Sequence, residues 1–279
     1  MKRIVVVAVV SVLLTAIIMF TIFELQAQAN QLQADRLEEV DSNILNEKRN
    51  LLVHFPNGYD STKSYPVLYV LDGSSQDFRI ARISSILVGA EVMPEVIIVG
   101  IPNTNRNRDL TPHYGLQDQD GERYGEADRF LDFISNEAIP HIESKYNTSS
   151  YRMLVGHSRA GLFSFYAMLE KPGLFDAHFC FSPAFWRDNM LILSKAKDAI
   201  NQKKLAEGFL YMSLGTAEND KMKSAYDRMT QLFDGHNSNQ IRVEHHYTNG
   251  ASHGTNLVYS APHALKKWSD YYLGRAKVE

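Results

Sequence analysis

The hexapeptide Gly-His-Ser-Arg-Ala-Gly at residues 156–161 constrains the fold of this chain more than any other stretch. A short apolar segment that favours a β-strand, residues 151–155, precedes it. After it, apolar residues recur at helical spacing over residues 162–169. The sequence therefore predicts a strand, a sharp turn and a helix at this point.

Ser158 stands at the centre of that turn, and we interpret it as a nucleophile. Only small neighbours let the strand and the helix approach closely enough to push the hydroxyl out at the end of a sheet, and Gly156 and Ala160 are small. The usual pattern is G-x-S-x-G, so Ala160 takes the place of the second glycine, with Gly161 one residue later. The alternative is an ordinary turn in which the serine caps a helix.

Apolar strand-like runs alternate with helical stripes along the rest of the chain, which predicts an α/β fold with a mostly parallel central sheet and helices on both faces. No internal repeat and no boundary to a second domain interrupts this alternation. The predicted strands are residues 51–55, 66–71, 96–101, 151–155, 177–181, 210–214 and 241–247. The last helix is predicted over residues 259–273.

Two candidate acids and a histidine follow the serine, at the ends of later predicted strands. A serine hydroxyl is a weak nucleophile at neutral pH, so it needs an imidazole to remove its proton and a carboxylate to orient that imidazole. His253 lies in a loop beside a glycine, and Glu218 and Asp220 follow the strand before it. We favour Glu218 as the acid and keep Asp220 as the alternative. The order serine, acid, histidine is that of an α/β-hydrolase.

Composition excludes several other classes of function. The 279 residues are 44% hydrophobic, enough for a full core, and the formal net charge is −3 with both signs mixed, so no basic face is offered to nucleic acid. Cys180 is the only cysteine, which excludes an intramolecular disulfide and a thiolate metal cluster. His245 and His246 are adjacent on a predicted strand and point to opposite faces. We expect no metal and no cofactor.

The N-terminus has the pattern of an export signal. Basic residues at positions 2 and 3 precede an apolar run over residues 4–23, and residues 27–29, Ala-Gln-Ala, match a cleavage site. The run is also long enough to span a bilayer, so a signal peptide at residues 1–29 and an uncleaved membrane anchor both stay open. We predict a polar spacer over residues 30–46 and a catalytic domain over residues 47–275, either periplasmic or secreted, or held at the membrane by residues 4–23.

A long polar connection over residues 102–124 contains Arg106 and Arg108. Connections of this length in compact domains are usually functional or mobile. The two guanidinium groups, with Trp186 after a neighbouring strand, are candidates to bind an anionic or aromatic group of a substrate. Alternatively, the arginines hydrogen-bond the loop to itself or face solvent.

Several motifs together resemble the putative-esterase family, which includes siderophore esterases of the enterobactin-hydrolase type, feruloyl esterases and the antigen 85 mycolyltransferases. The resemblance covers roughly residues 47–273. The motifs are P-V-L-Y-V-L-D-G at residues 66–73, R-N-R-D-L-T-P at 106–112, G-H-S-R-A-G at 156–161, S-P-A-F-W at 182–186 and S-H-G at 252–254.

The resemblance implies a single α/β-hydrolase domain without a separate lid domain. It also implies Ser158 as nucleophile, His253 as base and Glu218 as acid, with the backbone amides of Ser74 and Arg159 forming the oxyanion hole. We therefore predict a serine esterase that acts through an acyl-enzyme on a small-molecule ester, with a siderophore-like or aromatic acyl group favoured by the R-x-R-D-L-T-P segment. Two alternatives stay open: acyl transfer to a sugar or other alcohol, and a catalytically silent binding protein at the cell surface.

Overall fold

The computed structural model describes residues 34–113, 125–235 and 240–275, and its strands form one eight-stranded sheet in the order β1-β2-β4-β3-β5-β6-β7-β8. Strands β3 to β8 pair in parallel, whereas β2 runs antiparallel to both β1 and β4. The strands are β1 (Arg36–Ser42), β2 (Glu47–His54), β3 (Tyr65–Leu71), β4 (Ile97–Ile101), β5 (Thr148–His157), β6 (Ala177–Phe181), β7 (Gly208–Gly215) and β8 (Ile241–Thr248).

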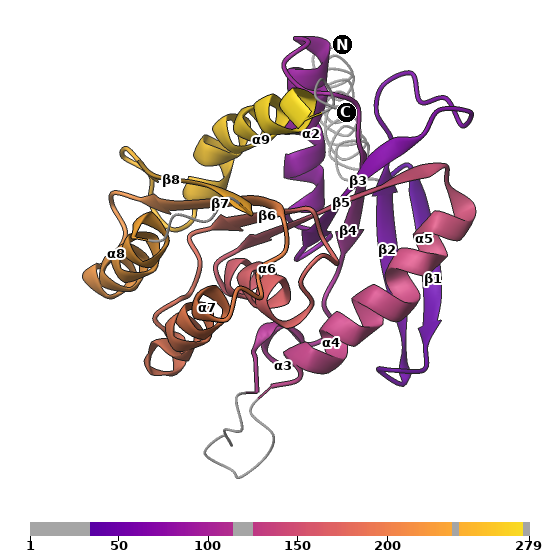
Figure 1. Cartoon of the computed structure of the whole chain (residues 1–279). Coiled ribbons are helices and arrows are strands. Elements are labelled where there is room, and N and C mark those ends of the chain that lie inside the picture. The colour runs from indigo at the N-terminus through magenta and orange to yellow at the C-terminus, as the bar shows by residue number, and fades with distance from the viewer. Residues whose placement is uncertain (1–33, 114–124, 236–239, 276–279) are drawn as a thin grey trace, which may run out of the picture. The chain divides into compact units, whose positions relative to one another are not determined.

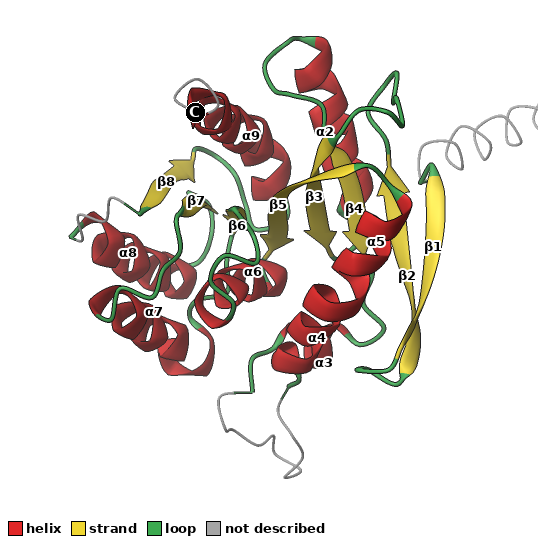
Figure 2. Cartoon of the chain, turned by 45° about the vertical axis from the view of Figure 1, so that its right-hand side comes forward, coloured by secondary structure: helices red, strands yellow, loops and turns green. Residues whose placement is uncertain are grey.

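Helices cover both faces of the sheet (Figures 1 and 2). One face carries α2 (Asp77–Gly89) and α9 (Asn256–Arg275). The other helical segments pack on the opposite face or at its margin. They are α3 (Arg106–Leu110), α4 (Ala127–Phe133), the π-helical turn η1 (Ile134–Ala138), α5 (Ile139–Lys145), α6 (Arg159–Glu170), the short turn η2 (Arg187–Met190), α7 (Leu191–Asn201) and α8 (Asp220–Asp234).

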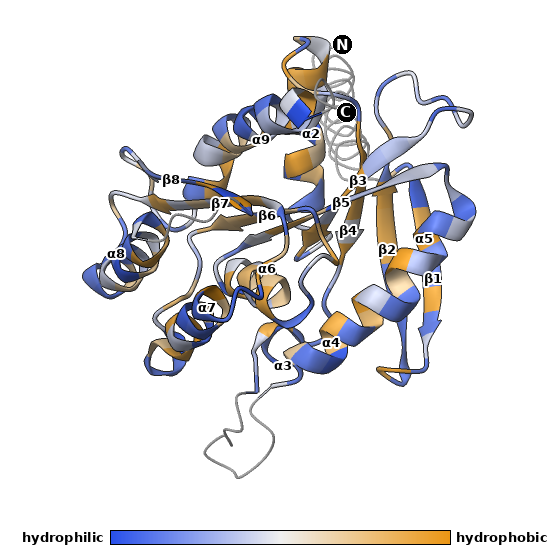
Figure 3. Cartoon of the chain, viewed as in Figure 1, coloured by the Kyte–Doolittle hydropathy of each residue, from blue (hydrophilic) through white to orange (hydrophobic). Residues whose placement is uncertain are grey.

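Burial on both sides explains the continuous apolar runs of the central strands. Every residue of β3, β4, β6 and β7 is buried, as the helices on each face require. Two hydrophobic clusters result, one under α2 and α9 and one under the helices of the other face. Figure 3 shows the hydrophobic colour gathered on the central strands. The sheet is therefore a rigid base for the loops at the carboxyl ends of its strands, where open α/β sheets bind ligands.

The predicted fold class is confirmed: the described residues form a single α/β-hydrolase domain. The predicted spacer at residues 30–46 is wrong for much of its length, because Arg36–Ser42 is the edge strand β1, in register with β2 from Arg36 opposite Val53 to Ser42 opposite Glu47. An edge strand needs few buried residues, and only Val40 and Ser42 of β1 are buried, which explains the polar sequence.

Two other features differ from the sequence prediction. Helix α3 lies inside the predicted polar connection, and the segment before β5 is helical and built from α4, η1 and α5. The predicted export signal, residues 1–29, lies outside the described residues. Among the residues that the structure describes, no helix has the length and apolar character needed to cross a membrane.

Candidate active site

Ser158 lies in a strained turn between β5 and α6. Its backbone has φ of 61° and ψ of −117°, a conformation that residues other than glycine rarely adopt. A Cβ atom on Gly156 would lie 2.0 Å from the carbonyl oxygen of Ala160, so only glycine fits at that position. Ala160 itself is fully buried, which shows that a methyl group is accommodated there. The Ser158 N–H donates to the carbonyl of Phe181 on the neighbouring strand at 2.9 Å and holds the turn in place.

His253 lies between Ser158 and Glu218 and contacts both. Its Nδ1 is 2.8 Å from Glu218 Oε2, and its Nε2 is 2.9 Å from Ser158 Oγ. A carboxylate only accepts hydrogen bonds, so Nδ1 carries the proton and Nε2 presents a lone pair to the serine hydroxyl. Serine, histidine and acid are thus joined by two hydrogen bonds, although they come from loops after three different strands. This arrangement can activate a serine hydroxyl.

The carboxylate of Glu218 is buried but fully hydrogen-bonded. Its side chain is 0% exposed, and its Oε1 accepts from the hydroxyl of Ser182 at 2.5 Å and from the N–H of Gly215 at 3.1 Å. Burial by itself would raise the pKa of Glu218. The hydrogen bonds from His253, Ser182 and Gly215 outweigh it and leave the pKa below its ordinary value. Glu218 is therefore held as a carboxylate, the form that orients an imidazole.

Ser182 and Asn256 support the acid, and the sequence analysis did not identify them as site residues. Ser182 has a positive φ of 45°, and its hydroxyl accepts from Asn256 Nδ2 at 3.0 Å while donating to Glu218. Asn256 is fully buried and also donates to the carbonyl of Ser213. Ser182 is the first residue of the S-P-A-F-W motif, so its place in that motif could have identified it. Asn256 follows S-H-G by two residues, and no pattern distinguished it from an ordinary helix start.

His157, the residue before the serine, packs locally. Its Nε2 donates to the carbonyl oxygen of His253 at 2.7 Å, and the two imidazole rings lie 4.8 Å apart. Burial is the main reason that the pKa of His157 falls to about 4, so its ring is neutral over most of the working pH range. This contact holds the His253 loop against the nucleophile turn without adding a second charge.

The turn after β3 brings a further backbone amide to this end of the sheet. Asp72 and Ser74 both have positive φ values, 54° and 73°, and a Cβ on Gly73 between them would lie 2.6 Å from the backbone of Ile101. The N–H of Ser74 has no hydrogen-bond partner among the described residues. Arg159 opens helix α6 directly after Ser158, and its guanidinium donates to Thr111 Oγ1 at 2.8 Å. The two predicted oxyanion residues thus flank the ends of β3 and β5, which are paired strands.

The two candidate arginines both bind carboxylates of the protein itself. Arg106 forms a two-pronged ion pair with Asp72, with Nε–Oδ1 and Nη2–Oδ2 distances of 2.7 and 2.8 Å. Arg108 bonds to Glu47 at 2.7 Å and to Asp109 at 2.9 Å. The side chain of Arg108 therefore points into the protein framework at β2. Arg106 is the more exposed of the two and lies nearer to the nucleophile turn.

Trp186 lines a hollow of about 390 Å³ together with Lys221, which lies in the first turn of α8. Lys221 Nζ lies 4.1 Å from the centroid of the Trp186 ring, a cation–π contact. Arg187 lies 5.6 Å from the same ring. Met190 and Arg228 complete much of the wall. Asp188 also lines the hollow, so two cations, Lys221 and Arg228, and one acid surround Trp186 there.

Asp220 and the histidine pair at 245 and 246 have no hydrogen bond to Ser158, His253 or Glu218 among the described residues. Asp220 is exposed in the first turn of α8, whose start is capped by the side chain of Asn219. His253 Nδ1 donates to Glu218, and Asp220 has no hydrogen bond to His253 among the described residues. His245 contacts Asp234, whereas His246 contacts Tyr211, so the two rings have no partner in common. No group of three ligand-type side chains suited to a metal ion occurs within the described ranges.

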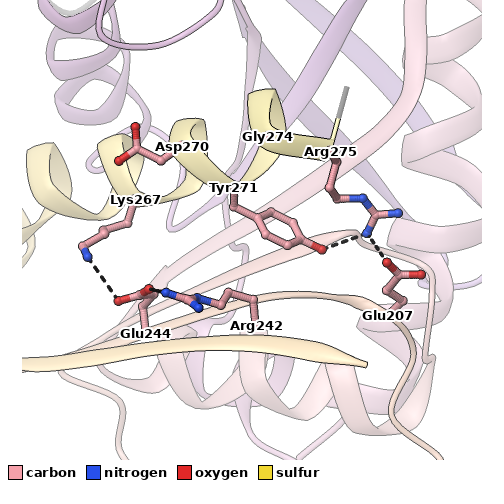
Figure 4. A pocket seen from close by; sticks show the side chains of 8 residues that line it. All are labelled: Glu207, Arg242, Glu244, Lys267, Asp270, Tyr271, Gly274 and Arg275. Atoms are coloured by element: carbon pink, nitrogen blue, oxygen red, sulfur yellow. Dashed lines mark hydrogen bonds and ion pairs between the residues drawn. The ribbon is translucent and has the colours of Figure 1, made fainter. Parts of the chain in front are cut away.

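A hollow without these residues lies elsewhere, between β8 and α9 (Figure 4). It measures about 670 Å³. We call it the β8–α9 groove; its lining residues are Glu207, Arg242, Glu244, Lys267, Asp270, Tyr271, Gly274 and Arg275. Its charges pair with one another, as Arg242 and Lys267 do with Glu244 and Arg275 does with Glu207. It contains no serine, cysteine or histidine, so its size does not make it the catalytic site.

The sheet order, the strained serine turn and the serine–histidine–acid contacts define an α/β-hydrolase. A family model described as "Putative esterase" matches residues 42–271, and the chain belongs to that family.

Two fungal siderophore esterases are among its relatives. The siderophore enterobactin esterase of Emericella nidulans is 33% identical over 185 residues, 58% of this chain and 61% of that protein. The siderophore triacetylfusarinine C esterase of Aspergillus fumigatus is 28% identical over 170 residues, 55% of this chain and 56% of that protein. The matched part is therefore less than two thirds of either relative.

A solved structure of an IroE-like serine hydrolase from Shewanella oneidensis superposes with a TM-score of 0.75 at 27% identity. The superposition covers 85% of this chain and 80% of that one. The likeness therefore extends over most of both chains.

Proposed function

We propose that this protein is an exported serine carboxylic-ester hydrolase that acts through an acyl-enzyme. The observation that carries the proposal is the pair of hydrogen bonds from His253, one to Ser158 Oγ at 2.9 Å and one to the buried Glu218 at 2.8 Å. Glu218 fixes the tautomer of His253, and His253 then removes the proton of the serine. The strained backbone of Ser158 keeps its hydroxyl at the carboxyl end of the sheet.

In the first half of the reaction, Ser158 Oγ attacks the ester carbonyl while its proton moves to His253 Nε2. The negative charge that develops on the carbonyl oxygen is stabilised by the backbone N–H groups of Ser74 and Arg159. Each oxyanion donor is worth about 3 to 4 kcal/mol in the transition state. The C–O bond to the alcohol then breaks, and the alcohol oxygen takes the proton from His253. The acyl group remains on Ser158.

In the second half, water takes the place of the alcohol. His253 Nε2 accepts a proton from water as the water oxygen attacks the acyl carbon. The bond to Ser158 Oγ breaks, and the serine recovers its proton from His253. Glu218 stays ionised throughout, which agrees with its lowered pKa.

The proposed substrate is an ester with an aromatic or anionic acyl group, such as a siderophore-like ester. The two fungal relatives are named for siderophore esters, which supports this class. The hollow lined by Trp186 combines an indole with the ammonium of Lys221 over its ring, and an aromatic or anionic acyl group could contact both. A short aliphatic acyl group would gain from neither contact.

The test is a panel of esters of one alcohol with different acyl groups, measured with the purified protein. We expect kcat/KM for a catechol or hydroxycinnamoyl ester to exceed that for a short aliphatic ester by at least about tenfold, which equals 1.4 kcal/mol. Trp186→Ala should narrow this preference. Equal kcat/KM values across the panel would contradict the proposed preference for an aromatic or anionic acyl group. The proposed ester-hydrolase activity would still stand.

Export is proposed from the N-terminal sequence. The basic start, the apolar run over residues 4–23 and Ala-Gln-Ala at 27–29 favour cleavage after Ala29. Mass spectrometry of the mature protein should then find Asn30 at the N-terminus. An intact N-terminal segment in the membrane fraction would instead identify residues 4–23 as an anchor.

A further inference from the structure

Arg106 connects the two backbone turns that flank the proposed oxyanion hole. On one side its Nε and Nη2 donate to the two carboxylate oxygens of Asp72, in the turn after β3 that carries Ser74. On the other side its Nη2 lies 3.4 Å from the carbonyl oxygen of His157, the residue before Ser158. One side chain thus spans the turn after β3 and the turn after β5.

The Asp72 turn depends on its hydrogen bonds because its backbone is strained. Asp72 and Ser74 have φ of 54° and 73°, which each cost free energy for residues with a Cβ. The carboxylate of Asp72 accepts from Arg106 and from Asn103 Nδ2 at 2.6 Å, and its carbonyl accepts from the N–H of Ser75 and Gln76. The N–H of Ser74, in the same turn, has no hydrogen-bond partner among the described residues.

Helix α3 gives Arg106 a fixed base. The helix is held by Asp109, which forms an ion pair with Arg49 at 2.8 Å with both side chains only 1% exposed. Breaking such a buried pair is strongly unfavourable, because it leaves an unpaired charge in the core. Arg106 therefore extends from a rigid element, and its fork geometry defines the position of Asp72 more closely than a single donor could.

We propose that Arg106 is a positioning residue that sets the distance between the Ser74 and Arg159 amides, rather than a residue that reads the acyl group. This inference rests on the proposed esterase function. Its guanidinium acts through Asp72 and through the His157 carbonyl, and both contacts are occupied without substrate. Removing it lets the two turns move apart, which weakens stabilisation of the oxyanion more than binding of the ester.

The variant Arg106→Ala tests this with p-nitrophenyl acetate, a neutral ester that offers no anionic group to an arginine. We expect kcat to fall about tenfold to thirtyfold, a part of the loss known for a deleted oxyanion donor, while KM stays within about twofold. Arg106→Lys should recover about threefold or more of the lost kcat, because an ammonium still reaches Asp72 but cannot form the fork. A loss confined to KM for anionic esters would overturn the proposal.

Arg129→Ala is a matched control. Arg129 is 40% exposed, pairs with Glu126 at 2.7 Å and donates to the carbonyl of Ile44, so it resembles Arg106 in exposure and partners but lies away from the nucleophile. It should leave kcat within about twofold. If Arg106→Ala and Arg129→Ala lower kcat equally, the effect is one of general stability and the proposal is wrong.

A second measurement separates this inference from the proposed function. Hydrogen–deuterium exchange of the free protein should show faster uptake in peptides covering residues 72–76 and 156–160 for Arg106→Ala, but not for Arg129→Ala. If the wild type hydrolyses no ester and yet both peptides exchange faster, the link between the turns holds and the proposed function fails. Unchanged exchange in both peptides would overturn the link, whatever the activity.

Discussion

Charged side chains gather both at the Ser158 end of the sheet and in the β8–α9 groove, but the carboxylates of the two regions differ in burial and in partners. At the catalytic end, the side chain of Glu218 is 0% exposed and directs its hydrogen bonds to His253, Ser182 and Gly215. In the groove, the side chains of Glu207 and Glu244 are 65% and 19% exposed and each is neutralised by a cation. Only at the Ser158 end of the sheet is a buried carboxylate held by a histidine that also contacts a serine.

This difference shows why hollow size is a poor guide to chemistry. A buried carboxylate is costly unless it is hydrogen-bonded, so its retention next to a histidine and a strained serine indicates function. In each ion pair of the groove at least one partner is 39% to 65% exposed, and pairs that stay in contact with solvent contribute little, so they need no function to explain them. The variants below test whether the two regions differ as this comparison predicts.

The largest effect should come from Ser158→Ala. Removal of the nucleophile leaves nothing to form the acyl-enzyme, so turnover of a small aryl ester should fall by about six orders of magnitude. Labelling by a fluorophosphonate probe should disappear, while the circular dichroism spectrum stays unchanged. Wild-type turnover in this variant would place the chemistry elsewhere, and the groove would then need to be reconsidered.

Glu218→Gln should follow. An amide at this position can leave the imidazole in the wrong tautomer, so we expect kcat to fall by about three to four orders of magnitude. Asp220→Asn is the natural control, because Asp220 is exposed and lies in the first turn of α8 without a contact to His253 among the described residues. Its kcat should stay within about threefold. The reverse ranking would move the acid to Asp220.

Low pH should destabilise the folded protein through its buried histidines. Burial lowers the pKa of His157, His178 and His246 to about 4, against 6.5 in the unfolded chain. Between these values the unfolded state binds protons and the folded state does not, so this stability is complete above pH 6.5 and is lost as the pH falls towards 4. His178, fully buried, should account for about 2 kcal/mol of the loss at pH 5.

The contribution of His178 can be measured by urea unfolding of the wild type and of His178→Leu at pH 7.5 and at pH 5. The leucine has no proton to bind, and Ser164 keeps its bond to the carbonyl of Leu154, so no donor is orphaned. The variant should lose less stability than the wild type between the two pH values. An equal loss would show that His178 is not the group that titrates.

The sequence predicted the central sheet and singled out Ser158, His253 and Glu218, which lie together in the structure, because both leave local patterns. Strands buried on both faces read as unbroken apolar runs, and a nucleophile turn needs small residues at fixed spacing. Strand β1 left no such pattern, since an edge strand with one exposed face reads as polar sequence. Its position depends on pairing with β2, which is a property of the whole hairpin.

The partners of Arg106 and Arg108 could not be derived from the sequence for a related reason. The R-x-R-D segment showed two cations and one acid, but their partners, Asp72, Glu47 and Arg49, lie on β2 and on the turn after β3. Long-range pairs of this kind depend on the folded arrangement of the strands. The spacing of charges within a loop cannot indicate whether they face a ligand or the protein.

The smallest effect should come from the β8–α9 groove. Glu244→Gln removes the carboxylate that faces both Arg242 and Lys267, at distances of 2.5 and 3.5 Å, and so it disturbs the groove more than any other single change there. Exposed ion pairs of this kind are worth about 0.2 to 1 kcal/mol, and salt screens them, so the loss of stability should be about 1 kcal/mol or less and should shrink in 1 M NaCl. Since no groove residue contacts Ser158, His253 or Glu218 among the described contacts, kcat for an aryl ester should be unchanged. A fall in kcat of more than about threefold would show that α9, which begins three residues after His253, transmits changes in the groove to the base. The two regions would then be coupled through that helix, and the separation drawn from their burial would not hold.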